Sequence, residues 1–178
     1  MTGARARLAL GLIAAGSIVL FAGCGYHTAG KGTRLPATVQ TIAVPAFANR
    51  TQQYKVEQML TQAVVRELIV RTKYRIVNKV EPDADAILKG TVTSIQISPV
   101  TFDTTTGRVS SVLVTVGVSV SLVDRKGKVL FENPGYTFRE QYQITQDIST
   151  FFEETSPALH RLSDNFARTL VSDVLEAF

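Results

Sequence analysis

Hydrophobic and polar residues alternate most regularly in the middle of the chain. From Val109 to Val123 an aliphatic residue stands at nearly every second position, and Ser, Thr and Gly fill most of the positions between. A period of two is typical of a strand with one face on a core. The stretch has no charged residue, whereas exposed edge strands usually carry charges. We therefore expect a central strand, whose small hydroxylic face is either solvated or packed closely against another protein.

Two long strands are expected beside it, at residues 86–102 and 128–144, joined through turns at 103–108 and 124–127. In the first, the apolar positions change parity part-way, which predicts a bulge near Ser94. The second is interrupted by Asn-Pro-Gly at 133–135. Shorter apolar runs at 41–47 and 74–78 predict two more strands. Pro45 indicates that the first of these lies at an edge or stops pairing early.

Two other stretches repeat their apolar residues at spacings of three and four, the period of a helix packed on one side. The first covers residues 53–71, with Asn49 or Thr51 as its expected cap, and the second starts at Ser156-Pro157, a cap followed by a first-turn proline. The expected buried faces are Val56, Met59, Leu60, Ala63, Val64 and Ile69, and Leu159, Leu162, Phe166, Leu170, Val174 and Leu175.

These elements predict an α+β fold in the order β-α-β-β-β-β-α. The apolar stripes of both helices need a partner, and the aliphatic sheet face supplies it. We expect a mixed β-sheet with long antiparallel strands and two α-helices packed on one face. No internal repeat or second domain is indicated. The 178 residues, 45% hydrophobic and 19% charged, are enough for one such core.

The chain begins with a different pattern. Residues 1–23 combine a basic start, an apolar run and a small pair before Cys24, as in a secretory signal peptide. Ala-Gly-Cys resembles the lipobox of bacterial lipoproteins, so Cys24 is the expected lipidation site; the alternative is a free thiol after a conventional signal peptide. Gly25 after the cysteine favours the outer membrane. Residues 24–38 are then a lipidated tether, and residues 39–178 a single domain.

Gly25 to Lys31 also resembles a phosphate-binding loop, but this interpretation fails. Position 32 is Gly where a Mg²⁺-binding hydroxyl is needed. No strand precedes the loop and no helical pattern follows it. The formal charge of +4 is scattered along the chain, which argues against nucleic-acid binding. His27 and His160 have no acidic residue or cysteine at ligand spacing. We expect no metal, no cofactor and no enzymatic activity.

The order of these segments resembles the LPS-assembly lipoprotein family LptE. The resemblance is carried by CGYH at 24–27, Leu35-Pro36, TIAVPAFANRT, the first helix, ADAILKGTV and FFEE before the last helix. It implies a lipoprotein that sits in the lumen of the outer-membrane β-barrel LptD. Such a protein helps to assemble that barrel and to deliver lipopolysaccharide to the outer leaflet.

The resemblance also implies basic residues near the sheet turns that contact lipopolysaccharide phosphates. The candidates here are Arg108 first, then Arg125, Lys126, Lys128 and Arg139. The alternative is ordinary solvation of turn residues. A second functional interpretation is a lipoprotein that activates a peptidoglycan synthase. Such proteins usually have a long tether, whereas about fifteen residues here reach about 50 Å. A lipoprotein with an unrelated ligand is a third interpretation.

Overall fold

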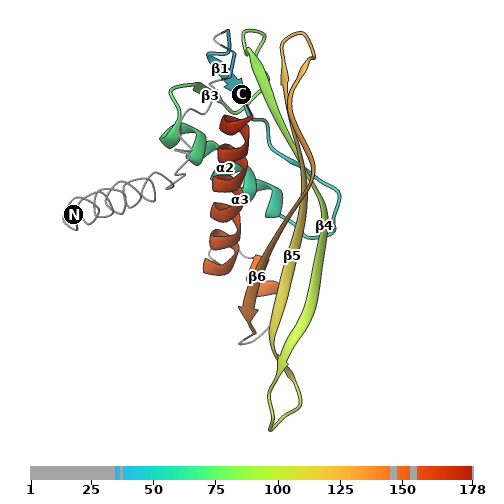
Figure 1. Ribbon diagram of the computed structural model, residues 1–178. Coiled ribbons are helices and arrows are strands. Elements are labelled where there is room, and N and C mark those ends of the chain that lie inside the picture. The colour runs from blue at the N-terminus through green and yellow to red at the C-terminus, as the bar shows by residue number, and fades with distance from the viewer. Residues whose placement is uncertain (1–34, 37, 145–147, 153–155, 178) are drawn as a thin grey trace, which may run out of the picture. The chain divides into compact units, whose positions relative to one another are not determined.

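The computed structural model describes residues 35–36, 38–144, 148–152 and 156–177. The expected signal peptide and Cys24 lie outside the described residues. The described chain forms one mixed sheet with two long helices on one face (Figure 1). The elements are β1 (Thr41–Ala43), β2 (Ala48–Asn49), α2 (Val56–Arg71), β3 (Arg75–Val77), β4 (Ala86–Phe102), β5 (Val109–Asp124), β6 (Val129–Gln143), the 3₁₀ helix η1 (Ile148–Phe152) and α3 (Pro157–Glu176). The predicted α+β class is confirmed, and the element order agrees except that the structure adds β2 and η1.

The strand order is β3-β1-β4-β5-β6, and β2 pairs with β4 beside β1. Strand β1 is parallel to both β3 and β4, whereas β4, β5 and β6 are antiparallel. Because β1 lies between two strands, Pro45 does not mark an edge. Instead β1 ends at Ala43, two residues before the proline, so the alternative of early termination is correct.

Strand β5 is central, as its uncharged sequence predicts. Its apolar residues at even-numbered positions from Val112 to Leu122 are at most 4% exposed, and they face the helices. The register with β4 slips between Val92 and Ser94, which confirms the expected bulge. On the other side, the register with β6 slips opposite Asn133 to Tyr136, where Asn-Pro-Gly interrupts the strand.

Helix α2 differs from the prediction in two details. Leu68 is buried at 2% exposure, whereas Ile69 is 59% exposed, because the helix presents the 56-60-64-68 row to the core. Neither Asn49 nor Thr51 caps it: the N-cap is Lys55, in a left-handed conformation without a side-chain cap bond. The Asn49 side chain instead bonds Gln53 and reaches Glu57 in the first turn.

Helix α3 starts as predicted, with Ser156 Oγ accepting the Leu159 N–H at 3.4 Å and Pro157 in the first turn. Its fully buried Phe166 meets three rings edge-on, those of Phe47, Tyr136 and Phe138, at centroid distances of 5.3 to 6.2 Å. Such ring pairs add to the free energy gained by burial. This aromatic cluster joins α3 to β6 and to the segment before β2.

Candidate functional site: the sheet turns and the uncovered sheet face

The five basic residues proposed from the sequence do not form one site. Arg108 lies in the turn that joins β4 to β5, and the Arg125–Lys128 group lies in the turn that joins β5 to β6. These turns stand at opposite ends of β5, about 50 Å apart for 16 residues at about 3.3 Å each. Arg139 lies between them, on β6 opposite Thr115. Any phosphate contacts would therefore belong to separate places.

The β4–β5 turn is organised by Asp103. Its carboxylate accepts the backbone N–H groups of Thr105 at 3.0 Å and Thr106 at 2.6 Å, and the Thr106 hydroxyl at 2.8 Å. These bonds, led by those from Thr106, lower the pKa of Asp103. Gly107 closes the turn at a φ of 67°, which a glycine adopts without strain. The acid is thus used to shape the turn, next to the exposed Arg108.

Arg125 is held by residues that directly precede β4. Its guanidinium donates to the carbonyls of Asp83 at 2.6 Å and Ala84 at 3.3 Å, and pairs with Asp85 at 3.1 Å. Asp85 also accepts the backbone N–H groups of Gln40 and Thr41, both at 3.0 Å. These two bonds first, and then the charge of Arg125, lower the pKa of Asp85. Arg125 therefore fastens the β5–β6 turn to the start of β4.

Lys126 and Lys128 differ from Arg125. Their backbone N–H groups donate to Asp124 at 2.7 and 2.8 Å, which holds the turn. Both lysines are exposed, and no ion pair joins either of them to another described residue. Of the three candidates in this turn, these two have no carboxylate partner among the described residues.

The sheet face opposite the helices carries small polar side chains. In one row across the three strands, Gly117 of β5 lies between Ser94 of β4 and Thr137 of β6. In another row, Thr115 lies between Gln96 and Arg139. The β5 residues on this face are half-buried rather than buried, and no helix or strand among the described residues packs over them. Its members are Lys89, Thr91, Ser94, Gln96, Ser98, Leu113, Thr115, Gly117, Ser119, Ser121, Glu132, Thr137, Arg139 and Gln141. We name this set the uncovered sheet face.

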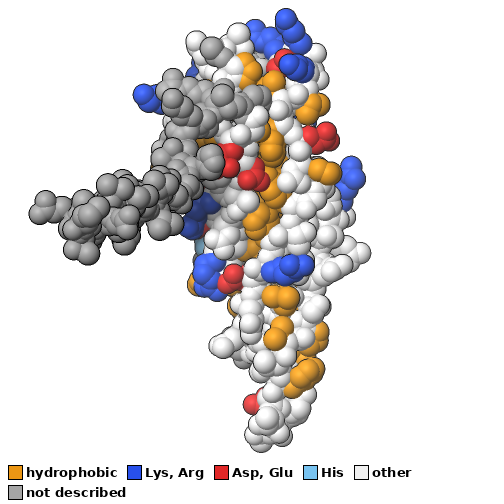
Figure 2. Space-filling view, in the orientation of Figure 1, with side chains coloured by type: hydrophobic (Ala, Val, Ile, Leu, Met, Phe, Trp, Pro, Cys, Tyr) orange, Lys and Arg blue, Asp and Glu red, His pale blue; other side chains and the backbone are white. Residues whose placement is uncertain are grey.

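The β4–β5 hairpin extends beyond the helices at one end (Figure 1). Three of its apolar residues are exposed there: Ile97 at 38%, Val100 at 46% and Phe102 at 59%. Figure 2 shows hydrophobic and uncharged polar side chains along this end of the hairpin. Solvent-facing apolar residues gathered on one projection are typical of a surface that meets another molecule.

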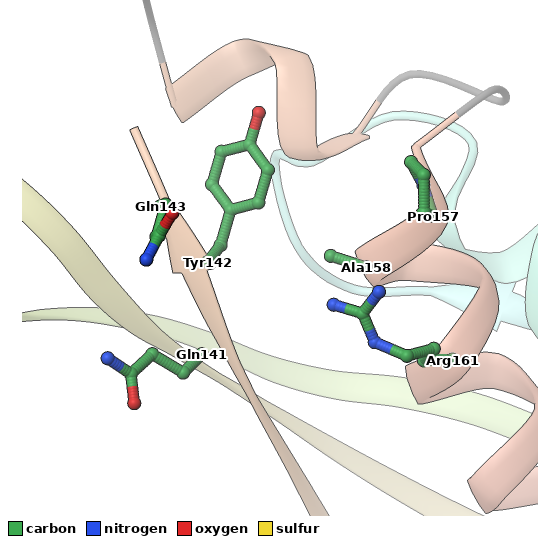
Figure 3. Close-up of a pocket in the computed structure, with 6 residues that line it drawn as sticks. All are labelled: Gln141, Tyr142, Gln143, Pro157, Ala158 and Arg161. Atoms are coloured by element: carbon green, nitrogen blue, oxygen red, sulfur yellow. The ribbon is translucent and has the colours of Figure 1, made fainter. Parts of the chain in front are cut away.

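A hollow of about 640 Å³ lies where β6 meets the start of α3 (Figure 3). Tyr142 lies on the side of β6 that faces the short helix η1, and Gln141 points to the other side. Arg161 from α3 lines the hollow, but its guanidinium pairs with Glu140 at 2.6 Å. Because this carboxylate already neutralises the arginine, the hollow offers little attraction to an anion.

Within the described ranges, no three His, Cys, Asp or Glu side chains gather as metal ligands. His160 lies on α3, and His27 falls outside the described residues. No helix in the part of the chain that the structure describes is both long and apolar enough to cross a membrane.

A family model, described as LptE, lipopolysaccharide-assembly, matches residues 39–174, which cover every described strand, α2 and all but the last two residues of α3. This chain belongs to the LptE family. The match includes both sheet turns, the uncovered sheet face and the hairpin. No curated protein sequence is similar enough to give a match.

Solved structures show where else the LptE-family fold of this chain occurs. A Xanthomonas campestris protein is similar with a TM-score of 0.51 and 16% identity, over 81% of this chain and 90% of that one. A Chlamydia trachomatis protein reaches a TM-score of 0.50 at 11% identity, over 76% and 95%. At these identities the likeness concerns the fold alone.

Proposed function

We propose that this protein is an outer-membrane lipoprotein, acylated on Cys24, that plugs an LptD-type β-barrel. In this role it assists assembly of the barrel and delivery of lipopolysaccharide to the outer leaflet. It acts by binding and not by catalysis. Membership of the lipopolysaccharide-assembly family supports the general role. The observation that most directly supports a role as a plug is the uncovered sheet face.

The uncovered sheet face suits contact with a protein wall. Its Ser, Thr and Gly side chains are short, so another backbone or side chain can approach closely. Its hydroxyls can bond polar groups on the partner, which avoids leaving them buried and unpaired. Along β5 this face has no charge that would need desolvation. A plug in a polar barrel lumen needs such a surface, since the interior of such barrels is polar.

The first experiment is affinity purification of the tagged, lipidated protein from detergent-solubilised outer membranes. A large β-barrel recovered in equal amount supports the plug. A peptidoglycan synthase recovered instead would favour the alternative of a synthase activator. No stoichiometric partner would refute the plug.

The same purification can locate the contact. Ser119→Arg places a long charge on the uncovered sheet face, and we expect it to abolish recovery of the barrel. Val70→Arg adds the same charge on α2 at a position that is 80% exposed, and recovery should persist. If both variants retain the barrel, the uncovered sheet face is not the contact. Thermal unfolding of both variants checks that the fold is intact.

Direct contact with lipopolysaccharide phosphates is a separate part of the proposal. The residues are Arg108, Arg125, Lys126, Lys128 and Arg139, and they need separate tests because three different places are involved. Arg108→Gln and Arg139→Gln test the turn at one end and the uncovered sheet face. At the other end, Lys126→Gln with Lys128→Gln is the suitable pair, because Arg125 also holds β4. A variant in contact with phosphate should weaken lipopolysaccharide binding and reduce its salt dependence.

A further inference from the structure

Strand β6 forms one edge of the sheet, and no described strand pairs with its outer side. In continuation of the β5–β6 ladder, the Ile144 N–H donates to the Ser110 carbonyl at 2.9 Å. Hydrogen-bonded pairs alternate along an antiparallel ladder, so the even-numbered residues of this part of β6 turn their backbone groups toward β5. The odd-numbered residues turn theirs outward, and these are Thr137, Arg139, Gln141 and Gln143.

This edge lacks several features by which proteins usually prevent strand addition, such as lysine, proline and bulges. Residues 137–143 contain no Lys, Pro or Gly, and their register with β5 is unbroken. The outer edge of β4 beyond β2, in contrast, contains Pro99 and a register shift on either side of residues 94–99. Strand β3, at the other end of the sheet, has only three residues. Among the described strands, β6 therefore offers the edge best suited to another strand.

Residues 137–143 are complementary to a second copy of themselves when the two-fold axis passes through Glu140. The facing residues from opposite copies are then Thr137 and Gln143, Phe138 and Tyr142, and Arg139 and Gln141. This register pairs all four outward residues and places two aromatic side chains opposite each other on the helix side, a favourable cross-strand pair. An axis at Arg139 would instead place two guanidinium groups opposite each other, and like charges in that position are destabilising.

The axis brings together two Glu140 carboxylates, each with its own counter-ion. Arg161 of α3 pairs with Glu140 at 2.6 Å, and the arginine side chain is still 58% exposed. Two acids and two arginines at the axis are electrically neutral together. The hollow of about 640 Å³, which Tyr142 and the start of α3 line, offers room for an aromatic side chain of the second copy (Figure 3).

We propose that the free protein forms a dimer in which the β6 edges of two copies pair and join the two sheets into one. The outward residues of each copy then exchange backbone hydrogen bonds with the other, as in other strand additions. The occupant is a second copy because one segment supplies both sides of the contact, with its charges balanced and its rings facing. The dimer concerns the protein before it meets a barrel, so the inference does not depend on the proposed plug.

Disulfide cross-linking tests the register. The mature chain is made without lipid as a Cys24→Ser variant, which removes the only native cysteine. Glu140→Cys places two cysteines opposite each other at the axis, where facing Cα atoms are about 4.5 Å apart, a distance that a disulfide can span. Thr137→Cys is the matched control, since its two copies would be about 20 Å apart along the paired strands. We expect a disulfide-linked dimer of the first variant only, and equal cross-linking of both would overturn the inference.

Sedimentation equilibrium over a range of protein concentrations gives a second test that leaves Glu140 intact. Gln141→Lys places a positive charge opposite Arg139 of the second copy, and Gln141→Glu places a negative one there. The facing pair occurs twice, and each changes the equilibrium about threefold, so we expect the dissociation constant to rise about tenfold with Lys and to fall about tenfold with Glu.

The matched control for these charges is Gln96→Lys and Gln96→Glu. Gln96 is exposed on the same sheet face but lies on β4, away from the β6 edge, so both variants should leave the dissociation constant unchanged. Equal responses at the two positions would show an effect of net charge alone and overturn the inference. A chain that stays monomeric at every concentration would also overturn it and would leave the edge to a strand of another protein. No barrel enters these assays, so their failure is distinct from failure to recover a barrel.

Discussion

The bond between Tyr136 and Asp173 gives the sharpest test of how the sheet is joined to α3. Tyr136 on β6 is 7% exposed, and its hydroxyl donates to the Asp173 carboxylate at 2.5 Å. Tyr136→Phe keeps the ring and its contacts with Phe138 and Phe166, so only the hydroxyl is lost. Hydrogen bonds to charged groups contribute about 1.5–3 kcal/mol. We expect the free energy of unfolding to fall by about 2 kcal/mol.

Because of the same bond, we expect the free energy of unfolding to depend on pH in the alkaline range. Burial first, and then the hydrogen bond and charge of Asp173, raise the pKa of Tyr136. A raised pKa in the folded state means that the stabilisation is complete below the unfolded-state pKa of about 10 and is lost as the pH rises through the native value. Stability should therefore decline above about pH 10, and Tyr136→Phe should reduce that decline.

Urea unfolding of the unlipidated mature chain measures both effects, at neutral pH and in a series up to strongly alkaline pH. Asp173→Asn and the double variant complete a cycle that isolates the pairwise free energy. A loss below about 0.5 kcal/mol in Tyr136→Phe would refute the assigned strength of the bond. An unchanged alkaline decline in the phenylalanine variant would refute the assignment of that titration to Tyr136.

Substitutions at three further positions test the core and the start of the sheet. Phe166→Ala should lower the free energy of unfolding by about 3–5 kcal/mol and Phe166→Leu by clearly less, in urea unfolding; equal losses would contradict the importance of the ring contacts. In Gly90→Ala the new Cβ would overlap the Phe47 ring, so we expect a loss of about 1–3 kcal/mol, and an unchanged melting temperature would show that the ring can move aside. Native contacts lower the pKa of Asp85, so its contribution is full above the unfolded-state pKa of about 4 and is lost as the pH falls through the lower native value. Asp85→Asn should thus be less stable than wild type at neutral pH and equally stable in strong acid, and a constant difference across an acid titration would argue against this linkage.

Local patterns in the sequence were sufficient for much of the fold. The period of β5 and its lack of charge place it in the centre of the sheet, and the parity change in β4 places the bulge near Ser94. Ser156-Pro157 marks the start of α3. These features can be predicted from the sequence because periodicity, bulges and caps depend on residues that are close in sequence.

Other features depend on contacts between distant segments. The choice of Leu68 over Ile69 for the core follows from which row of α2 packs inward, the row 56-60-64-68. Asp85 ties Arg125 to the start of β1, and this gives one of the candidate phosphate ligands a structural role. The sequence shows which residues are charged, but not which carbonyl and carboxylate groups bind them in the folded protein.

The sequence by itself determined the elements, their order and the family of this protein. One feature of the sequence was not used to predict a site: residues 71–75, RTKYR, place three basic residues within five positions. Only the tertiary structure decided that this run meets Val39 and Leu175 in one groove, and that the turn candidates stand at opposite ends of β5. The physical reason is that helix and strand periods are set by near neighbours, whereas a surface is assembled by chain segments far apart in sequence.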